Sequence, residues 1–238
     1  MQTTIQLGEI VADVVLKNIK NVHLSVYPPN GHVRISAPER MSLDNIRAYA
    51  VTKLDWIKAQ QAKLRAQERV TPRDYVDGES HFLWGKRYLL SVMETDSAPH
   101  VRVKGRRIQL HVRSGSTAQQ REDILEAWLR TQLKAAVPAV IEKWEPRLGV
   151  EVERFHVQRM KTKWGSCSPL RQAIRLNTEL AKKPVECLEY IVVHEMVHLL
   201  EPSHNSRFVG LMRDNMPKWK YYRDELNRLP VRHEEWKY

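Results

Sequence analysis

The sequence predicts an α+β fold, in which an antiparallel β-rich N-terminal part precedes a mainly helical C-terminal part. Residues 5–112 contain short runs that alternate apolar and polar side chains between turn sequences, as half-buried strands do. Residues 118–148 carry apolar side chains at helical spacing, and a later helical run ends in His-Glu-Met-Val-His. We expect a β-rich region with one long helix over residues 1–115, and a mainly helical domain over residues 116–238.

The N-terminal region is expected to open with strands. The runs over residues 22–27 and 33–36 flank Pro-Pro-Asn-Gly, a turn sequence that predicts a β-hairpin. Ser42 is a suitable N-cap for a helix that the apolar spacing predicts from Leu43 to Arg69. A second set of short runs over residues 82–112 predicts a meander of antiparallel strands.

The C-terminal part begins with a helix predicted over residues 118–148, with Gly149 as its C-cap and a kink at Pro138. Strands are expected over residues 150–157 and 173–177, with a loop or irregular edge over residues 160–168 between them. Pro184 suits the first turn of a helix that runs through His194 to Leu200. Two shorter helices are expected over residues 207–212 and 218–229.

His194 and His198 predict a metal site. In a helix they lie one turn apart, about 6 Å along the axis on one face, so both imidazoles can bind one ion. Zinc with three protein ligands keeps its fourth position open for water, as catalytic zinc sites do. His204 is the expected third ligand, because Glu201-Pro202-Ser203 ends the helix and turns the chain back. Glu195, beside the first ligand, is the expected general base.

Such a short motif also arises by chance, or around a purely structural metal. The context favours a catalytic metal. Residues 188–193 are apolar enough to predict a buried helix, and polar side chains carried into such a helix need a partner that offsets their desolvation. A zinc ion is such a partner, and residues 116–238 are therefore the expected catalytic domain.

The composition describes a basic, globular chain. No apolar run reaches the length of about 18 residues that a membrane span needs, and no signal peptide is apparent. Cys167 and Cys187 are too few for a disulfide framework, so we expect a cytoplasmic protein. The net charge of +11 favours anionic partners such as nucleic acid or nucleotides. No nucleic-acid-binding motif accompanies that charge, so this expectation rests on charge alone.

Three motifs in order carry a family resemblance: Lys-Thr-Lys-Trp-Gly-Ser-Cys-Ser over residues 161–168, Arg-Leu-Asn over residues 175–177, and the histidine motif over residues 194–208. Together they resemble the YgjP-like metallopeptidase family, a relative of the SprT-like proteases among the zincins. The resemblance covers the last third of the chain closely and the N-terminal half more loosely. It implies a zincin-like domain, Zn²⁺ held by His194, His198 and His204, Glu195 as catalytic base, and a peptide or protein substrate.

Other site residues follow less directly. The histidine spacing also occurs in metzincins, but Glu201 replaces their glycine, so that fold is not inferred. Gly165 would let the backbone approach a substrate cleft, and Ser166 lies beside it on a segment that could pair with an extended peptide. Trp164 belongs either to that cleft or to the core, and Cys167 is favoured as a packing residue. Asn177 is a possible cleft or ligand-orienting residue, or a hydrogen bonder at a strand end.

Three functions are consistent with these features. The leading one is peptide-bond hydrolysis by a zinc-activated water, with Glu195 accepting the proton. The first alternative is a metal-dependent nucleotide phosphohydrolase, a pyrophosphatase, which the basic charge would suit although phosphoryl transfer usually uses magnesium. The second alternative is a nucleic-acid-binding module with a structural metal, which would need a fourth ligand that the sequence does not supply.

Overall fold

The computed structural model describes residues 2–27, 31–66, 73–160 and 163–229. The described residues form two compact units, one up to residue 66 and one from residue 73 to residue 229, and each has its own hydrophobic core. The expected boundary near residue 115 differs from this division. Strands before residue 115, through Leu90 and Leu110, share one core with the long helix that follows them, so they belong to the second unit.

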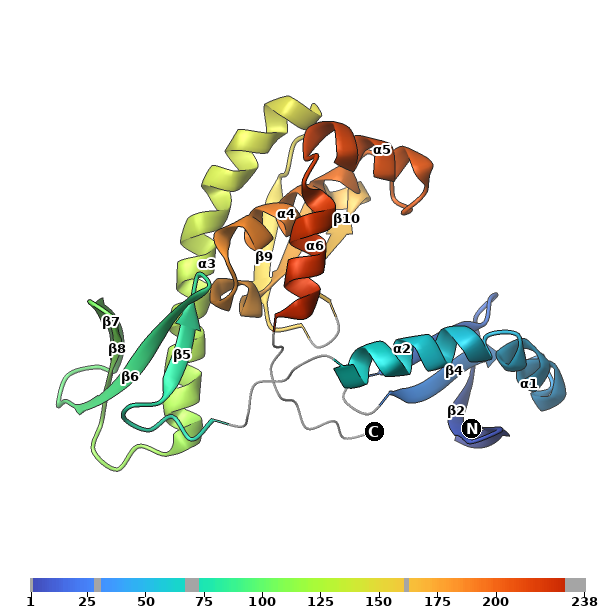
Figure 1. Cartoon of the computed structure of the whole chain (residues 1–238), viewed down its shortest axis with the longest axis horizontal. Coiled ribbons are helices and arrows are strands. Elements are labelled where there is room, and N and C mark those ends of the chain that lie inside the picture. Colours follow the sequence, from blue (N-terminus) through green and yellow to red (C-terminus); the bar gives the residue numbers. More distant parts are fainter. Residues whose placement is uncertain (1, 28–30, 67–72, 161–162, 230–238) are drawn as a thin grey trace. The chain divides into compact units, whose positions relative to one another are not determined.

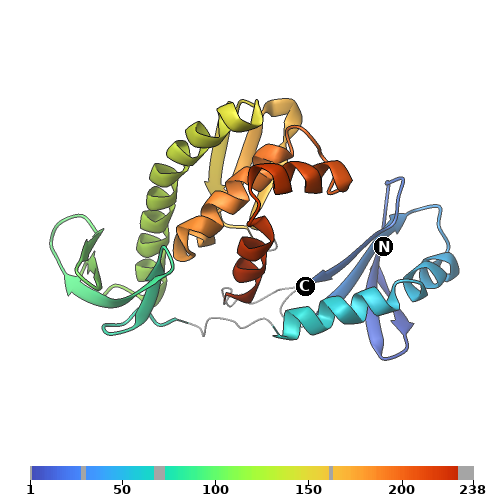
Figure 2. The same cartoon turned by 45° about the horizontal axis from the view of Figure 1, so that its top comes forward.

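The first unit is a four-stranded sheet covered by two helices (Figure 2). Its sheet has the order β1-β2-β4-β3, and its elements are β1 (Gln2–Leu7), β2 (Ile10–Lys17), β3 (His23–Tyr27), β4 (His32–Pro38), α1 (Leu43–Val51) and α2 (Leu54–Ala66). The predicted hairpin is confirmed, because β3 pairs antiparallel with β4, while residues 28–30 of its turn lie outside the described residues. β2 and β4 are parallel.

The single helix expected over residues 43–69 is wrong within the described residues, because α1 ends at Val51 and α2 begins at Leu54. Ser42 caps α1 as predicted, accepting a hydrogen bond from the Asn45 N–H. At the break, the Thr52 hydroxyl donates a hydrogen bond to the Tyr49 carbonyl at 2.7 Å. Such a side-chain bond competes with the helical ladder. Residues 67–69 lie outside the described residues.

The second unit begins with another four-stranded sheet, of order β5-β6-β8-β7. Its strands are β5 (Ser80–Leu83), β6 (Lys86–Glu94), β7 (His100–Lys104) and β8 (Arg107–Val112). The predicted antiparallel meander is wrong in one pairing, since β6 lies parallel to β8. β8 buries Ile108, Leu110 and Val112 and takes a central position, whereas the more exposed β7 forms an edge. Alternation of side chains predicts the strands but not their order.

Helix α3 (Ala118–Leu148) has the predicted bounds. Thr117 forms a capping box with Gln120 at its start, and Gly149, at φ 64°, ends it in the left-handed conformation. The helix continues through Pro138 as one element (Figure 1). One stripe of α3 is buried: Leu125, Leu129, Leu133, Val137, Ile141, Trp144 and Leu148. Figure 1 shows that the helix runs from the β5–β8 sheet past β9.

A small three-stranded sheet of order β10-β11-β9 follows, built from β9 (Arg154–Gln158), β10 (Gly165–Ser168) and β11 (Ala173–Asn177). Short 3-10 turns η1 (Pro169–Arg171) and η2 (Thr178–Lys182) come after β10 and β11. The strand predicted over residues 173–177 is confirmed, and the one predicted from residue 150 begins at Arg154. The expected irregular edge contains a regular edge strand, β10, antiparallel to β11.

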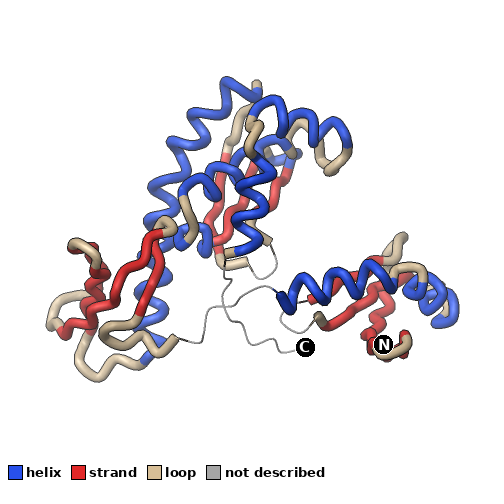
Figure 3. The backbone as a smooth tube through the Cα atoms, in the orientation of Figure 1, coloured by secondary structure: helices blue, strands red, loops and turns tan. Residues whose placement is uncertain are grey.

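Three helices complete the unit: α4 (Val185–Val197), α5 (Ser206–Asn215) and α6 (Trp219–Arg228) (Figure 3). α4 contacts α3, α5 and α6 as well as β10 and β11, so it is buried on nearly every side. Glu189 of α4 ties it to α3, accepting hydrogen bonds from Lys143 Nζ at 2.6 Å and Trp144 Nε1 at 2.7 Å. Among the described residues, no helix is both long and apolar enough to cross a bilayer.

Candidate active site

The structure brings the three predicted histidines together. His194 lies in the last turn of α4, and His198 is the C-cap of that helix. His204 Nε2 lies 3.0 Å from His194 Nε2 and 3.1 Å from His198 Nε2. One ligand atom from each of the three residues lies within 4.8 Å of the others, so the group could hold one ion.

The turn between the second and third histidine is stabilised by Glu201. Its carboxylate accepts hydrogen bonds from the Ser203 N–H at 3.2 Å and the Ser203 hydroxyl at 2.8 Å. After His204, Asn205 caps α5 by accepting a hydrogen bond from the Phe208 N–H. Glu201 therefore shapes the turn in place of a glycine, and its carboxylate is outside the metal-binding group.

The donor chemistry fits a metal ion. The Glu201 carbonyl lies 3.0 Å from His198 Nδ1, which favours a proton on Nδ1 and leaves the Nε2 lone pair directed at the other histidines. Burial, followed by the charges on His198 and His204, lowers the pKa of the His194 imidazole to about 3, so this ring is neutral at neutral pH. Nitrogen lone pairs this close repel one another unless a cation lies between them. Tetrahedral zinc spaces its nitrogen ligands by about 3.3 Å.

Aromatic side chains support the histidine rings. Phe208 is buried, and its ring centroid lies 4.9 Å from that of His194 and 4.7 Å from those of His198 and His204. Tyr190, one turn before His194 on α4, makes an edge contact with the His194 ring at 5.8 Å. These contacts restrict the orientation of the imidazoles before any ligand binds.

Glu195 points from α4 toward strand β10. A Cβ atom built on Gly165 would lie 2.5 Å from Glu195 Oε1, so the carboxyl lies directly against the glycine backbone. Burial raises the pKa of the Glu195 carboxyl to about 8, and the positive charge of Lys163 opposes that rise. Glu195 is thus a buried acid whose close contact with β10 is possible because residue 165 has no side chain.

These residues line one cleft of about 530 Å³. Its walls come from the start of β10, from α4, from the turn before His204, and from α6. Trp164, Gly165 and Ser166 line it together with the histidines and Glu195. Trp164 also packs against the core, so its side chain belongs to both the cleft wall and the edge of the core. Cys167 lines the cleft as well; burial, followed by Glu195, raises the pKa of its thiol to about 11, which keeps it protonated.

Asn177 is not among the residues that line this cleft. It is buried, and its side-chain amide donates to the carbonyls of Met160 and Lys163 at 2.8 and 2.9 Å, while its Oδ1 accepts from the Glu179 N–H. The Asn177 N–H also donates to the Trp164 carbonyl at 2.9 Å. Asn177 therefore anchors the chain on both sides of residues 161–162 and fixes where β10 begins.

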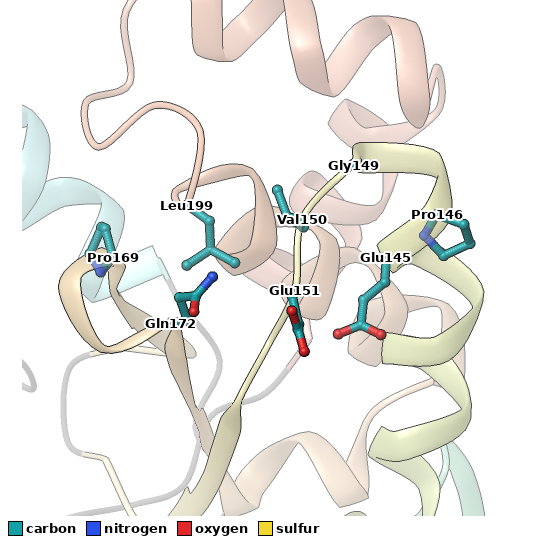
Figure 4. Close-up of a pocket in the computed structure, with 8 residues that line it drawn as sticks. All are labelled: Glu145, Pro146, Gly149, Val150, Glu151, Pro169, Gln172 and Leu199. Atoms are coloured by element: carbon teal, nitrogen blue, oxygen red, sulfur yellow. The ribbon is translucent and has the colours of Figure 1, made fainter.

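A second and larger hollow, of about 680 Å³, lies at the C-terminal end of α3 (Figure 4). Its walls are Glu145, Pro146, Gly149, Val150, Glu151, Pro169, Gln172 and Leu199. None of the predicted site residues is among them. Volume alone would favour this hollow, but it lacks the histidines and the buried acid, so the smaller cleft is the candidate active site.

The sequence did not identify four residues of the site, three that line the cleft and one that packs against the histidine rings. Lys163 and Arg223 line the cleft and make it basic, and Asn227 lies one turn after Arg223 on α6. Phe208 had a usable signal, because an N-cap at Asn205 places residue 208 in the first turn of a helix, next to the third histidine. No pattern in the sequence predicts that α6 packs beside α4.

The chain is similar to known metallopeptidases. The family model of the YgjP-like metallopeptidase domain matches residues 20–229. The metallopeptidase zymogen of Pyrococcus abyssi abylysin shows 22% identity and a TM-score of 0.36, covering 38% of this chain and 90% of that chain. The zymogen of Methanocaldococcus jannaschii jannalysin shows 22% identity and a TM-score of 0.34, covering 38% and 92%. These two likenesses are slight and add nothing to the family match.

No curated protein matches the chain. The family model, however, spans most of the described residues of both units, including every residue of the histidine cluster. The chain therefore belongs to the YgjP-like metallopeptidase family and is a metal-dependent hydrolase.

Proposed function

We propose that the chain is a zinc-dependent peptidase whose reaction takes place at His194, His198, His204 and Glu195. The observation that carries this proposal is the convergence of three imidazole Nε2 atoms in one cleft, beside a buried carboxyl. Imidazole donors suit zinc better than magnesium or calcium, which prefer oxygen ligands. Zinc held there supplies Lewis acidity, which polarises a peptide carbonyl and makes water a stronger acid.

Glu195 is the proposed general base. It follows His194 directly, so its side chain leaves α4 about 100° around the helix from that ligand and lines the same cleft from another side. Burial raises the pKa of the Glu195 carboxyl, and a zinc cation at the adjacent histidines would lower it again and so favour the carboxylate, which can accept a proton from the attacking water and return it to the leaving amine. Burial in the cleft wall holds the carboxyl in one place for both transfers.

Strand β10 is the proposed substrate platform. It lies at an edge of its sheet, with β11 on one side and no strand among the described residues on the other. An edge strand presents unpaired backbone groups, to which an extended peptide adds as a further strand. Because Gly165 and Ser166 of β10 also line the cleft, a peptide on this edge would place a peptide bond near the histidines.

The charge of the cleft favours a second candidate, hydrolysis of a nucleoside triphosphate. Lys163 and Arg223 line the cleft, and Glu195 is the one acidic residue among its described lining residues. Two cations in a concave site attract phosphate groups. The peptidase remains the first candidate because phosphoryl transfer usually depends on oxygen-liganded magnesium.

Metal analysis and a choice of substrates test the proposal. We expect about one zinc per chain, and cleavage of an unfolded protein that stops on chelation and returns with zinc. His204→Ala should lose both zinc and activity. His156→Ala, which removes an exposed histidine from β9, should lose neither.

The other outcomes separate the alternatives. Undiminished zinc in His204→Ala would remove this residue from the site. Consumption of nucleoside triphosphates with unfolded protein left intact would favour the phosphohydrolase. A fold that survives chelation, with salt-sensitive nucleic-acid binding and no hydrolysis of either substrate, would favour a nucleic-acid-binding module with a structural metal.

A further inference from the structure

The sheet formed by β5, β6, β8 and β7 has one side in the core and one side open. Side chains on the inner side, such as Leu90 and Leu110, share the core of α3. The register places a second set on the opposite side, which we call the outer face: Ser80, Phe82, Arg87, Leu89, Ser91, Met93, His100, Arg102, Lys104, Arg107, Gln109 and His111. Figure 1 shows this sheet beside one end of α3.

Pairing across the strands gathers the basic residues of the outer face. Arg107 of β8 lies between Leu89 of β6 and Lys104 of β7 in the register. One row further along, Gln109 pairs with Arg102. Neighbouring strands are about 4.8 Å apart, so these three cations lie within one small area. Arg87, opposite Phe82 on β5, adds a fourth.

Among the described residues of the four strands, the outer face carries no acidic side chain that would offset this charge. Glu94 is the one acid among those residues, and it pairs with buried Val112, so it belongs to the inner side. The sheet of the first unit has the same strand order but a different outer face, where Asp13 pairs with Arg34 in the register. The uncompensated charge is therefore particular to the second sheet and does not follow from its topology.

The outer face also carries aromatic and apolar side chains around the cations. Phe82, Leu89 and Met93 are 39%, 36% and 40% exposed, respectively. His100 and His111 are opposite one another, and their rings stack at 4.3 Å with 7° between the planes. A face kept only for solubility would carry charges of both signs and few exposed apolar groups. This one combines positive charge with groups that can stack on bases.

We propose that this outer face binds single-stranded nucleic acid. Arg102, Lys104 and Arg107 would contact phosphates, while Phe82 and the His100–His111 pair would contact the faces of unpaired bases. A duplex hides its base faces and would use the cations alone. A membrane surface would also be attracted by the cations, but it offers no aromatic rings for stacking. The inference is independent of the proposed peptidase chemistry, because no residue of this face lines the cleft.

Fluorescence anisotropy of a labelled 20-nucleotide oligouridylate with the full-length, zinc-loaded protein tests the proposal. Arg102→Glu with Arg107→Glu should weaken binding by about tenfold or more and reduce the slope of log affinity against log salt by about 1.4. Arg130→Glu with Lys134→Glu, exposed positions one turn apart on α3, changes the net charge equally and should weaken binding less than about threefold. Phe82→Ala should weaken binding by about fivefold or more.

Several results would overturn the proposal. These are absent binding, equal losses in the two double variants, no effect of Phe82→Ala, or stronger competition by a duplex of equal length. Anionic vesicles that bind the wild type with the same dependence on Arg102 and Arg107, while the oligonucleotide does not bind, would identify a membrane surface instead. Unchanged thermal unfolding of each variant, and unchanged cleavage of an unfolded protein, would show that losses of binding are local.

Discussion

The two four-stranded sheets of this chain share one plan. In each, the first strand pairs antiparallel with the second, the second lies parallel to the fourth, and the third pairs antiparallel with the fourth. Their first turns differ. Gly8 is exposed, and a Cβ built on it would meet nothing within 4 Å. In the second sheet, the Trp84 N–H donates to the Ala181 carbonyl at 2.8 Å and the Gly85 N–H to that of Lys182 at 3.3 Å.

This difference shows how the second sheet comes to support the helix that carries the histidines. Gly85 packs against Pro184, the N-cap of α4, so the second sheet contacts the start of the histidine helix. The helices that follow also differ, since α1 and α2 have 9 and 13 residues whereas α3 has 31. A helix of that length covers its sheet and extends beyond it to support α4. The second sheet therefore supports the histidine helix through its first turn and through the long helix that follows it.

The largest expected contrast between the units is catalytic. Glu195→Gln keeps the shape of the side chain but removes the base, so hydrolysis should fall by about two to four powers of ten while zinc content is retained. The matched change in the first unit is Asp13→Asn. Asp13 lies on β2, and its carboxylate lies 3.1 Å from His32 Nε2, a contact that an amide can keep. Activity assays with metal analysis compare the two variants.

Two results would break this contrast. If Asp13→Asn reduced activity as far as Glu195→Gln did, the first unit would contribute to catalysis. If Glu195→Gln lost its zinc or its fold, Glu195 would have a structural role.

The second prediction concerns Gly165 in the second unit. Gly165→Ala would place a Cβ 2.5 Å from Glu195 Oε1 and 2.8 Å from its Cγ, so the carboxyl must move. A displacement of about 1 Å can reduce a rate by about 10²-fold. We expect kcat to fall by that order with little change in KM or zinc content. Gly210→Ala in α5, where a Cβ would meet nothing within 4 Å, is the control and should keep full activity. An active Gly165→Ala variant would show that Glu195 tolerates displacement.

Local patterns in the sequence predicted single elements well. The bounds of α3 and β11 and the helical cap at Ser42 follow from periodicity and capping residues, which act within a few positions. The parallel pairing of β6 with β8 could not be predicted in this way, because both strands present an apolar face to the core and either order would bury it. The break between α1 and α2 falls at Thr52 and Lys53, where neither a Gly nor a Pro signals it in the sequence.

In the candidate site, too, the residues set by local spacing could be predicted and those set by packing between elements could not. Histidines four residues apart on a helix, and a third after a turn, are visible in the sequence because their geometry is local. Phe208 under the rings, Gly165 against Glu195, and Arg223 on the far wall are brought there by packing between separate elements. Asn177 was recognised as a residue of interest, but its hydrogen bonds to Met160 and Lys163 depend on the path of the chain between two strands.

The third prediction measures the contact between the second sheet and α4. Gly8 and Gly85 both have positive φ, 65° and 74°, so alanine at either position carries a backbone cost of about 1 kcal/mol. At Gly85 the new Cβ would also lie 2.9 Å from Pro184 Cγ and 3.1 Å from its Cα. We expect Gly85→Ala to lower the free energy of unfolding by about 2 to 3 kcal/mol and Gly8→Ala by about 1 kcal/mol. If denaturant titrations gave equal losses of unfolding free energy for the two variants, the contact between Gly85 and Pro184 would not contribute to stability.

The smallest expected effect concerns a buried position that is apolar in the first sheet and titratable in the second. Ile5 and His81 both lie on the inner side, two residues before the end of the first strand of their sheets, and both are buried. Burial, followed by the charges of Arg73 and Lys182, lowers the pKa of His81 from 6.5 to about 4. Unfolded protein then binds a proton more readily than folded protein between these values. The stabilising contribution is complete above pH 6.5 and is lost as the pH falls toward 4.

Between pH 7 and pH 5 this amounts to about 1 to 2 kcal/mol of unfolding free energy. His81→Ile, which gives the second sheet the residue of the first, should remove that part of the pH dependence, whatever it does to stability at pH 7. The measurement is the difference in unfolding free energy between wild type and variant at several pH values, which cancels the titration of groups that do not contact His81; Glu79, 3.6 Å from His81 Nε2, does contact it. Ile5→Val in the first unit should give a difference that is constant with pH. A constant difference for His81→Ile as well would show that His81 titrates normally in the folded protein.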